Sequence, residues 1–186
     1  RFEVVIDDLE KNNFIARCHM DKSNNLWVVT PNDIRCYNST TCQLKQQIKP
    51  FRYITFSYLD SNGNLWLASY NQIRIINTRS GQYTTVPAVI SNHKRLSNTI
   101  ITKMHPYNNS SLLINTQKDG LFLYNYISGT IVHQSESGFP FEAPNFEITT
   151  FFTDSQKNLW IGSYDQSFVV KYFYKELRLY HQSVAL

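Results

Sequence analysis

Three stretches of the chain repeat one phrase, and this repeat constrains the fold more than any other feature. Each phrase begins with Asp, ends with Asn-Leu-Trp, and places the Trp six residues after the Asp. The copies run from Asp21 to Trp27, from Asp60 to Trp66 and from Asp154 to Trp160. They contain all three tryptophans of the 186-residue chain. Self-similarity at such a period indicates a repeat array, and we expect an array to bind rather than to catalyse.

A fourth, degenerate copy carries Leu113 where the other copies carry Trp. The anchor positions 27, 66, 113 and 160 are then 39, 47 and 47 residues apart. About 45 residues hold four short antiparallel strands, which is one blade of a β-propeller. The sequence therefore predicts an all-β fold: a β-propeller segment of about four blades of four antiparallel strands, part of a larger propeller.

The second copy shows how one blade is expected to fold. We expect strands at residues 53–59, 65–69, 73–77 and 82–86, because these runs are rich in β-branched and aromatic residues. Asp60 opens the first turn, where its carboxylate can accept hydrogen bonds from later backbone amides. Gly63 stands where a positive φ is expected, which Gly adopts without steric cost. Asn24 is the next best choice there, whereas Lys157 should strain or remodel its turn.

The repeat also predicts blade boundaries and a role for its anchors. We expect a single segment, 1–186, with these parts: residues 1–9 as the last strand of a preceding blade, and blades at 13–48, 52–86, 99–133 and 146–182. Each Trp, or Leu113 in its place, should fill the wedge between adjacent blades rather than contact a ligand. The hydroxyl residues three positions later should hydrogen-bond into the blade; they are Thr30, Ser69, Thr116 and Ser163.

Composition excludes several other classes of protein. The chain is 42% hydrophobic and only 17% charged, which suits a packed core. Its net charge of +4 comes from scattered basic residues, not from the basic stripe of a nucleic-acid site. No apolar run is long enough to span a membrane, and the first residues do not form a signal peptide. We expect no cofactor and no metal.

Three cysteines are too few and too irregular for a disulfide framework. Cys36 and Cys42 flank a predicted hairpin turn and could face each other; the alternative is that Cys18, Cys36 and Cys42 are separate thiols. No pair has the spacing of a structural zinc site.

The repeated phrase, followed by an aliphatic residue and a Ser or Thr two positions on, resembles the two-component regulator propeller repeat. A second hallmark is the run from Leu96 to Ile100, Leu-Ser-Asn-Thr-Ile, which is similar to the segment that opens such repeats. The resemblance covers about residues 1–182. The chain departs from the family pattern at the third strand, where only Gly120-Leu121 keeps the usual Gly-Leu. This departure weakens any transfer of site details from the family.

The resemblance implies the periplasmic sensor region of a Bacteroidetes hybrid two-component system, a histidine kinase that is anchored in the inner membrane. Such sensors bind oligosaccharides or related nutrients without catalysis. The chain itself carries no kinase motif, so we expect it to be a fragment of the sensor. The remaining blades of the parent chain, or a second copy of this chain, would complete the ring. We expect neither nucleic acid nor direct membrane insertion among its interactions.

Ligands of propellers usually bind the face that holds the connections between strands two and three and between successive blades. Two of these connections, 87–98 and 134–145, are long, and long loops on a rigid scaffold tend to carry function. Aromatic, amide and charged side chains on this face suit a sugar. The candidate ligand-binding residues are Tyr70, Asn71, His93, Lys94, Arg95, Lys118, Asp119, Tyr164 and Asp165. Phe139 and Phe141 offer similar chemistry.

Two alternatives to a sensor stay open. One is a propeller enzyme, since the repeat also resembles that of streptogramin lyase. His93 with Glu136 or Glu142 could then meet across the two long loops as an acid–base pair. No nucleophile elbow or His-Glu metal motif supports this alternative, and we assign no catalytic residue. The other alternative is a scaffold for protein–protein interaction.

Overall fold

A computed structural model of the chain describes residues 17–49, 53–70, 72–85, 93–96, 99–143, 147–163 and 170–172. The chain divides into two compact units, Arg1–Ser91 and Asn92–Leu186. The described residues form only β-strands and their connections, with no α-helix. The predicted all-β class is thus confirmed.

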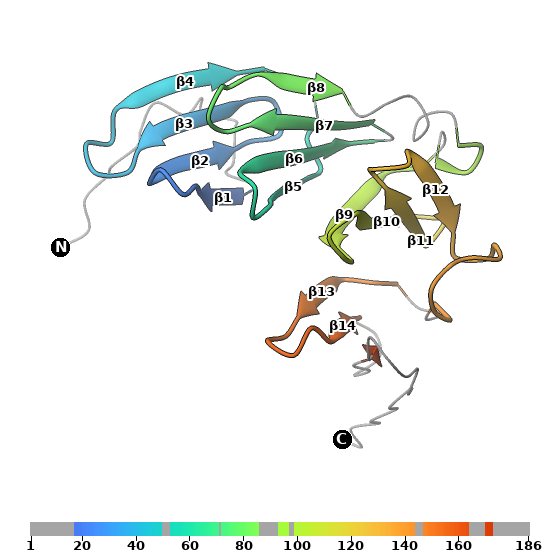
Figure 1. Cartoon of the computed structure of the whole chain (residues 1–186). Coiled ribbons are helices and arrows are strands. Elements are labelled where there is room, and N and C mark those ends of the chain that lie inside the picture. The colour runs from blue at the N-terminus through green and yellow to red at the C-terminus, as the bar shows by residue number, and fades with distance from the viewer. Residues whose placement is uncertain are drawn as a thin grey trace, which may run out of the picture. The chain divides into compact units, whose positions relative to one another are not determined.

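The first unit contains two four-stranded antiparallel sheets whose strands follow chain order (Figure 1). The first sheet consists of β1 (Arg17–Met20), β2 (Asn25–Val29), β3 (Ile34–Asn38) and β4 (Leu44–Ile48). The second consists of β5 (Phe56–Leu59), β6 (Asn64–Ser69), β7 (Gln72–Asn77) and β8 (Tyr83–Thr85).

The second unit repeats this arrangement. One sheet consists of β9 (Ile101–Pro106), β10 (Ser111–Thr116), β11 (Leu121–Asn125) and β12 (Thr130–His133). The next consists of β13 (Thr150–Thr153), β14 (Leu159–Gly162) and β15 (Val170–Tyr172). The last strand of the blade expected at 146–182, and the strand of a preceding blade expected at residues 1–9, lie outside the described residues.

One strand differs from its expected bounds for a clear reason. The first strand of the second copy was expected at residues 53–59, but β5 begins at Phe56. Tyr53 has a φ of +58°, which is left-handed backbone and cannot belong to a β-strand. The three residues from Tyr53 to Thr55 therefore enter the sheet as an irregular segment.

Each unit packs its two sheets around one anchor of the repeat. Trp27 of β2 is 1% exposed and packs against Ile54, Leu65 and Leu67 of the following sheet. A buried indole of this size removes much apolar surface from water, and such burial is the main force that holds two sheets together.

Leu113 of β10 has the corresponding place in the second unit. It is fully buried and packs with Ile148, just before β13, and with Leu159 and Ile161 of β14. Tyr107 stands six residues before Leu113, at the Asp position of the other copies. Its ring lies 6.0 Å from that of Phe141, in the same apolar cluster. The degenerate copy therefore replaces a polar pair by an apolar one.

Candidate functional site

A cavity of about 660 Å³ lies within the second unit. The connection between β10 and β11 forms one wall, at residues 117–120. Arg95, from the long connection before β9, and Gln134 and Glu147, at the two ends of the connection after β12, also line it. Both long connections that the sequence singles out therefore contribute to the lining. Asn115, Thr116, His133 and Ile148 complete it.

The β10–β11 loop is held firmly by hydrogen bonds that involve its backbone. The Thr116 hydroxyl donates to the Gly120 carbonyl at 3.0 Å and accepts from the Asp119 amide at 3.1 Å. The Lys118 amide donates to the Thr99 hydroxyl at 3.3 Å. These bonds leave the side chains of Lys118 and Asp119 free to enter the cavity.

His133 supports the loop from the end of β12. Its Nε2 lies 2.7 Å from the Asp119 carbonyl oxygen, and a carbonyl only accepts, so Nε2 carries the proton and donates. Nδ1 then accepts from the Ser135 hydroxyl at 2.7 Å. His133 is 4% exposed, and both of its ring nitrogens are used in these bonds. We therefore assign it to positioning the loop.

Gln134 and Asn115 fix two further edges of the cavity. The Leu121 amide donates to Gln134 Oε1 at 2.6 Å, and Asn115 Nδ2 donates to the Ile148 carbonyl at 3.3 Å. Gly120 has a φ of +66°, and a Cβ there would lie 2.5 Å from Gln134 Oε1. A side chain at position 120 would displace the Gln134 amide from the Leu121 amide, and the positive φ itself favours Gly, so Gly120 supports the shape of the cavity.

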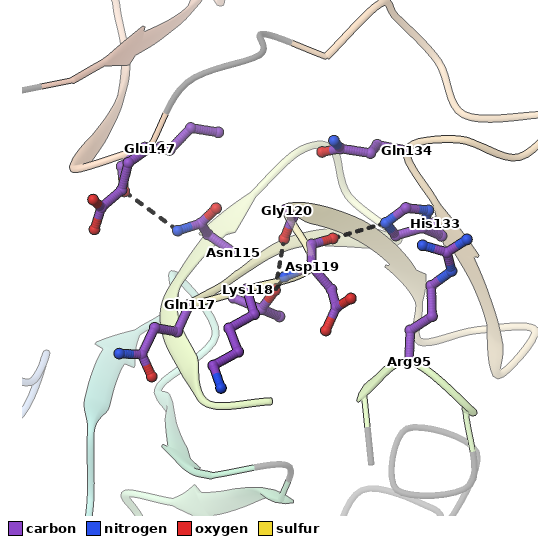
Figure 2. Close-up of a pocket in the computed structure, with 11 residues that line it drawn as sticks. Arg95, Asn115, Gln117, Lys118, Asp119, Gly120, His133, Gln134 and Glu147 are labelled. Atoms are coloured by element: carbon purple, nitrogen blue, oxygen red, sulfur yellow. Dashed lines mark hydrogen bonds between the residues drawn. The ribbon is translucent and has the colours of Figure 1, made fainter. Parts of the chain in front are cut away.

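Four charged groups line this cavity. Among the described residues, none hydrogen-bonds or pairs with the charged ends of Arg95, Lys118, Asp119 or Glu147. Figure 2 shows Lys118 and Asp119 extending from the loop into the space that Arg95 enters from the opposite side. Two cations, two carboxylates and the amides of Gln117 and Gln134 offer a ligand both donors and acceptors.

The candidate ligand residues from the sequence divide into three groups. Arg95, Lys118 and Asp119 meet in the cavity. His93 and Lys94 belong to the same unit but do not line it. Tyr70 lies in the first unit, where its exposed ring contacts Tyr53. The remaining candidates, Asn71, Tyr164 and Asp165, lie outside the described residues.

His93 packs beside the β-sheet of the second unit. Its ring meets that of Phe122 edge to face at 5.2 Å, and its Nε2 lies 3.7 Å from Glu136 Oε1. Its Nδ1 is buried without a hydrogen-bond partner among the described residues. The His93–Glu136 meeting is the contact that the enzyme alternative requires.

Two aromatic candidates lie in or against the apolar core. Phe141 is only 7% exposed and belongs to the apolar cluster around Leu113. Phe139 packs against it edge to face, with ring centroids 4.9 Å apart. Loop residues that follow a short strand can turn back into the core, and the sequence alone does not show which do. The sequence singled out the connection that begins at Gln134 but not that residue itself, and it indicated neither Asn115 nor Glu147, because single polar residues carry no motif.

The structure describes no metal centre and no membrane span. Within the described residues, no three His, Cys, Asp or Glu side chains are grouped closely enough to bind a metal ion. No helix there has the length and hydropathy that crossing a membrane requires. The three cysteines, Cys18, Cys36 and Cys42, are free thiols.

Comparisons with known proteins agree with this fold. Residues 143–165 match the family model described as two component regulator propeller. Two similar structures are extracellular domains of proteins described as hybrid two component systems from B. thetaiotaomicron. Their sequence identities are 19% and 14%, and their TM-scores are 0.61 and 0.66. The two matches cover 80% and 96% of this chain, but only 19% and 25% of those domains.

A third similar structure is an inactive virginiamycin B lyase from Staphylococcus aureus with quinupristin. It is 12% identical, with a TM-score of 0.65, and the match covers 89% of this chain and 54% of the lyase. A sequence comparison with curated proteins finds no significant match. At these identities the structures establish the fold alone. The chain is therefore a β-propeller segment in which residues 143–165 match the two component regulator propeller model, in agreement with its repeated phrase.

Proposed function

We propose that this chain is part of the ligand-sensing region of a membrane-anchored two-component regulator, and that its cavity binds an oligosaccharide without catalysis. The observation that carries the proposal is the cavity beside the β10–β11 loop, where four charged groups have no partner among the described residues. Unpaired polar groups in a concave site are those that a polar ligand satisfies. The regulator repeat and the likeness to extracellular sensor domains support a sensor.

The proposed setting is the periplasm, with further blades and a histidine kinase in the same parent chain. The extracellular character of the similar domains supports the setting. The chain spans a quarter or less of those domains, which supports further blades. Reading the gene on both sides of residues 1–186 tests this. More repeats, one membrane span and a kinase are expected, and a gene without a kinase would contradict the proposal.

Thermal-shift measurements test ligand binding. The probes are maltoheptaose, xylohexaose, galactotetraose, arabinohexaose and a pentamer of galacturonic acid. A ligand at about 100 times its dissociation constant adds about 2.7 kcal/mol to the stability of the state it binds. For a chain of this size, about 1 kcal/mol corresponds to about 2–4 °C in Tm. We therefore expect one class of glycan to raise Tm by several degrees.

Variants assign the shift to the cavity. Lys118→Ala removes a free cation, and Asp119→Asn removes a carboxylate while keeping the size of the side chain. Each should reduce the shift. Lys22→Ala is the control, because Lys22 is an exposed lysine of the other unit. If no glycan shifts Tm, or if both cavity variants respond like the wild type, oligosaccharide binding at this site is wrong.

An enzyme is the second candidate, and the 3.7 Å approach of His93 to Glu136 favours it. A base that faces a carboxylate beside a cavity can transfer protons. Incubation of the glycans and of a cyclic depsipeptide with the chain, followed by mass spectrometry, tests it. Product that disappears in His93→Ala would establish an enzyme. Intact substrates together with a thermal shift would favour the sensor.

A further inference from the structure

Left-handed backbone at residues other than Gly is informative in this chain, because the turns of the repeat account for most cases and the remaining ones need another explanation. Five such residues are described: Asn24, Cys42, Tyr53, Tyr70 and Lys157. Asn24 and Lys157 stand at the turn position that Gly63 occupies in the second copy. Cys42 stands where Gly81 and Gly129 stand, since the amide of each donates to the carbonyl of the Asn four residues before it. These three residues follow the turns of the repeat.

Tyr53 and Tyr70 are the two that no repeated turn explains, and they touch each other. Their φ angles are +58° and +47°. Their ring centroids are 5.8 Å apart, and the ring planes meet at 74°. Tyr70 follows β6 in a two-residue connection, because Ser69 pairs directly with Gln72. Such connections favour Gly, Asn or Asp, so a tyrosine there is strained.

Core packing does not account for this strain. Tyr53 is 57% exposed and Tyr70 is 47% exposed, although both are large apolar residues. Strained backbone persists where the surrounding structure enforces it, and it gathers at binding sites. The pairing of β5 with β6 brings these two strained residues together, and their exposed rings in contact form a surface that a ligand can use.

Tyr53 also stands at a repeat position whose equivalent in the second unit lines the cavity there. The Thr55 amide donates to the Ala68 carbonyl, as the Thr149 amide donates to the Gly162 carbonyl. Counting back two residues from each Thr, Tyr53 corresponds to Glu147, which lines the cavity of the second unit. Within its own sheet, Tyr53 therefore occupies a position whose counterpart contributes to a concave surface.

We propose that Tyr53 and Tyr70, together the aromatic corner, bind one pyranose ring by stacking. Because the two ring planes meet at 74°, they present two apolar faces at a steep angle to each other, and each ring carries a phenolic hydroxyl. A pyranose presents the complementary surface, an apolar face surrounded by hydroxyls. Two rings are far smaller than the roughly 800 Å² that each partner of a stable protein interface buries. The carbohydrate class rests on the proposed function, but the site is different and lies in the other unit.

Fluorine NMR of the whole chain, labelled with 3-fluorotyrosine, tests the aromatic corner. Tyr53→Phe and Tyr70→Phe assign the two signals. The probes are methyl β-D-glucopyranoside, methyl β-D-galactopyranoside and cellobiose. We expect at least one probe to shift both signals saturably. Tyr70→Asn should weaken this binding at least tenfold, because Asn keeps the left-handed backbone and removes the ring.

The same variant has a second expected effect that separates binding from folding. Asn tolerates a positive φ better than Tyr, so Tyr70→Asn should raise Tm by about 1–3 °C while it removes binding. Lys157→Asn is the matched control, since it relieves a left-handed residue in the other unit. It should raise Tm similarly and leave the titration unchanged.

Three results would overturn the aromatic corner. One is that none of the three probes shifts the signals of Tyr53 and Tyr70, or that the shift survives in Tyr70→Asn. Another is a fall in Tm for Tyr70→Asn, which would make the ring a structural element. The last is a shift that depends on protein concentration without any probe, which would make a second copy the occupant. The cavity is judged by its own thermal shift and Lys118→Ala, so the two proposals fail separately.

Discussion

At the scale of single residues, the aspartate of each repeat organises both its turn and its tryptophan. Asp21 Oδ1 accepts from the amides of Ser23 and Asn25, and Oδ2 accepts from the Trp27 indole at 2.9 Å. Asp60 and Asp154 accept the same indole bond from Trp66 and Trp160, at 3.0 and 2.9 Å. The carboxylate thus satisfies the one polar atom of an indole that is otherwise packed in the core.

At Asp21 and Asp154 these bonds favour the charged carboxylate. Hydrogen bonds from Asn158 lower the pKa of Asp154 to about 2, against a smaller opposing effect of desolvation and with help from the Trp160 indole. Burial by itself would raise the pKa of Asp21, but the hydrogen bonds from Trp27, Asn25 and Ser23 together more than offset it and lower that pKa.

Removing this carboxylate should destabilise the first unit. Asp21→Ala leaves the Trp27 indole and the Asn25 side chain without their acceptor, so we expect a loss of about 2–4 kcal/mol of unfolding free energy. Urea denaturation, followed by tryptophan fluorescence, measures it. Lys22→Ala, the exposed neighbour, should cost less than about 0.5 kcal/mol.

A double-mutant cycle separates the indole bond from the turn. Trp27→Phe removes the indole N–H, and in its presence Asp21→Ala should cost about 1 kcal/mol less than in the wild type. Full additivity of the two substitutions would mean that the carboxylate serves only the backbone of the turn.

At this scale the sequence indicates the turn but not all of its partners. The expectation that Asp60 accepts backbone amides follows from residue type alone. The indole bond forms only if the Trp side chain folds back over the turn, and the local preferences of these residue types do not predict that. Lys157 was expected to strain or remodel its turn. It takes a φ of +66° while the turn keeps its hydrogen bonds, so the turn is strained there and not remodelled.

At the scale of elements, a histidine on the first strand of one sheet bonds to a hydroxyl on the first strand of the next. His19 Nε2 lies 2.8 Å from Ser57 Oγ in the first unit, and His105 Nε2 lies 2.7 Å from Thr153 Oγ1 in the second. Burial lowers the pKa of both histidines to about 4, and the nearby Arg17 charge contributes at His19. Both links therefore form between neutral groups at neutral pH.

The two histidines predict acid sensitivity. Their pKa values are about 4 in the folded state and about 6.5 when exposed, so between these values the unfolded state binds more protons. Their contribution to stability is complete above about pH 6.5 and is lost as pH falls towards 4. Urea midpoints measured from pH 7.5 to 4.5 should show this decline.

Variants distinguish the histidines from other groups that titrate in acid. His19→Gln and His105→Gln keep a polar side chain near the partner hydroxyl but do not titrate. Each should be less stable than the wild type at pH 7.5 and lose less stability on acidification. A decline that stays equally steep in the double variant would show that other groups cause it.

The sequence predicts strands better than it predicts the contacts between them. Runs of β-branched and aromatic residues placed most strands within two residues of their ends, because such side chains favour pleated backbone. The turn between the third and fourth strands was expected, but its repeated bonding was not: the side-chain oxygens of Asn38, Asn77 and Asn125 accept amides two and three residues on. The signal was present as Asn followed four residues later by Gly or Cys42.

At the scale of the whole molecule, each compact unit has a core that two sheets share. Trp27 serves the first unit and Leu113 the second. Cores of this kind usually unfold as units, and the unit with the disturbed core opens first.

Hydrogen exchange should therefore distinguish the two anchors. Trp27→Ala should cost about 3–5 kcal/mol and speed exchange in β1–β3 and β5–β7 together. Leu113→Ala should cost about 2–5 kcal/mol and speed exchange in β9–β11 and β13–β14. Mass spectrometry of peptides from both units measures this. Uniform acceleration along the whole chain in either variant would show one cooperative unit instead.

The sequence indicates the face of the candidate cavity but not its full lining. Loop length singled out the connections that supply Arg95 and Gln134, and repeat position singled out Lys118 and Asp119. Glu147 enters because Ile148 beside it is buried in the core between two sheets. Tertiary packing of Ile148 thus positions Glu147, and a sequence pattern along one strand cannot predict that packing.

The indole–carboxylate bond has a consequence for how the sequences of such repeats diverge. Losing the indole alone leaves one carboxylate oxygen without its donor, and losing the carboxylate alone leaves the indole N–H without its acceptor. The degenerate copy has lost both and carries Tyr107 and Leu113 in their place. Blades of this lineage should therefore diverge by paired exchanges, and a search profile that scores the two positions jointly will recover blades that a search for tryptophan overlooks.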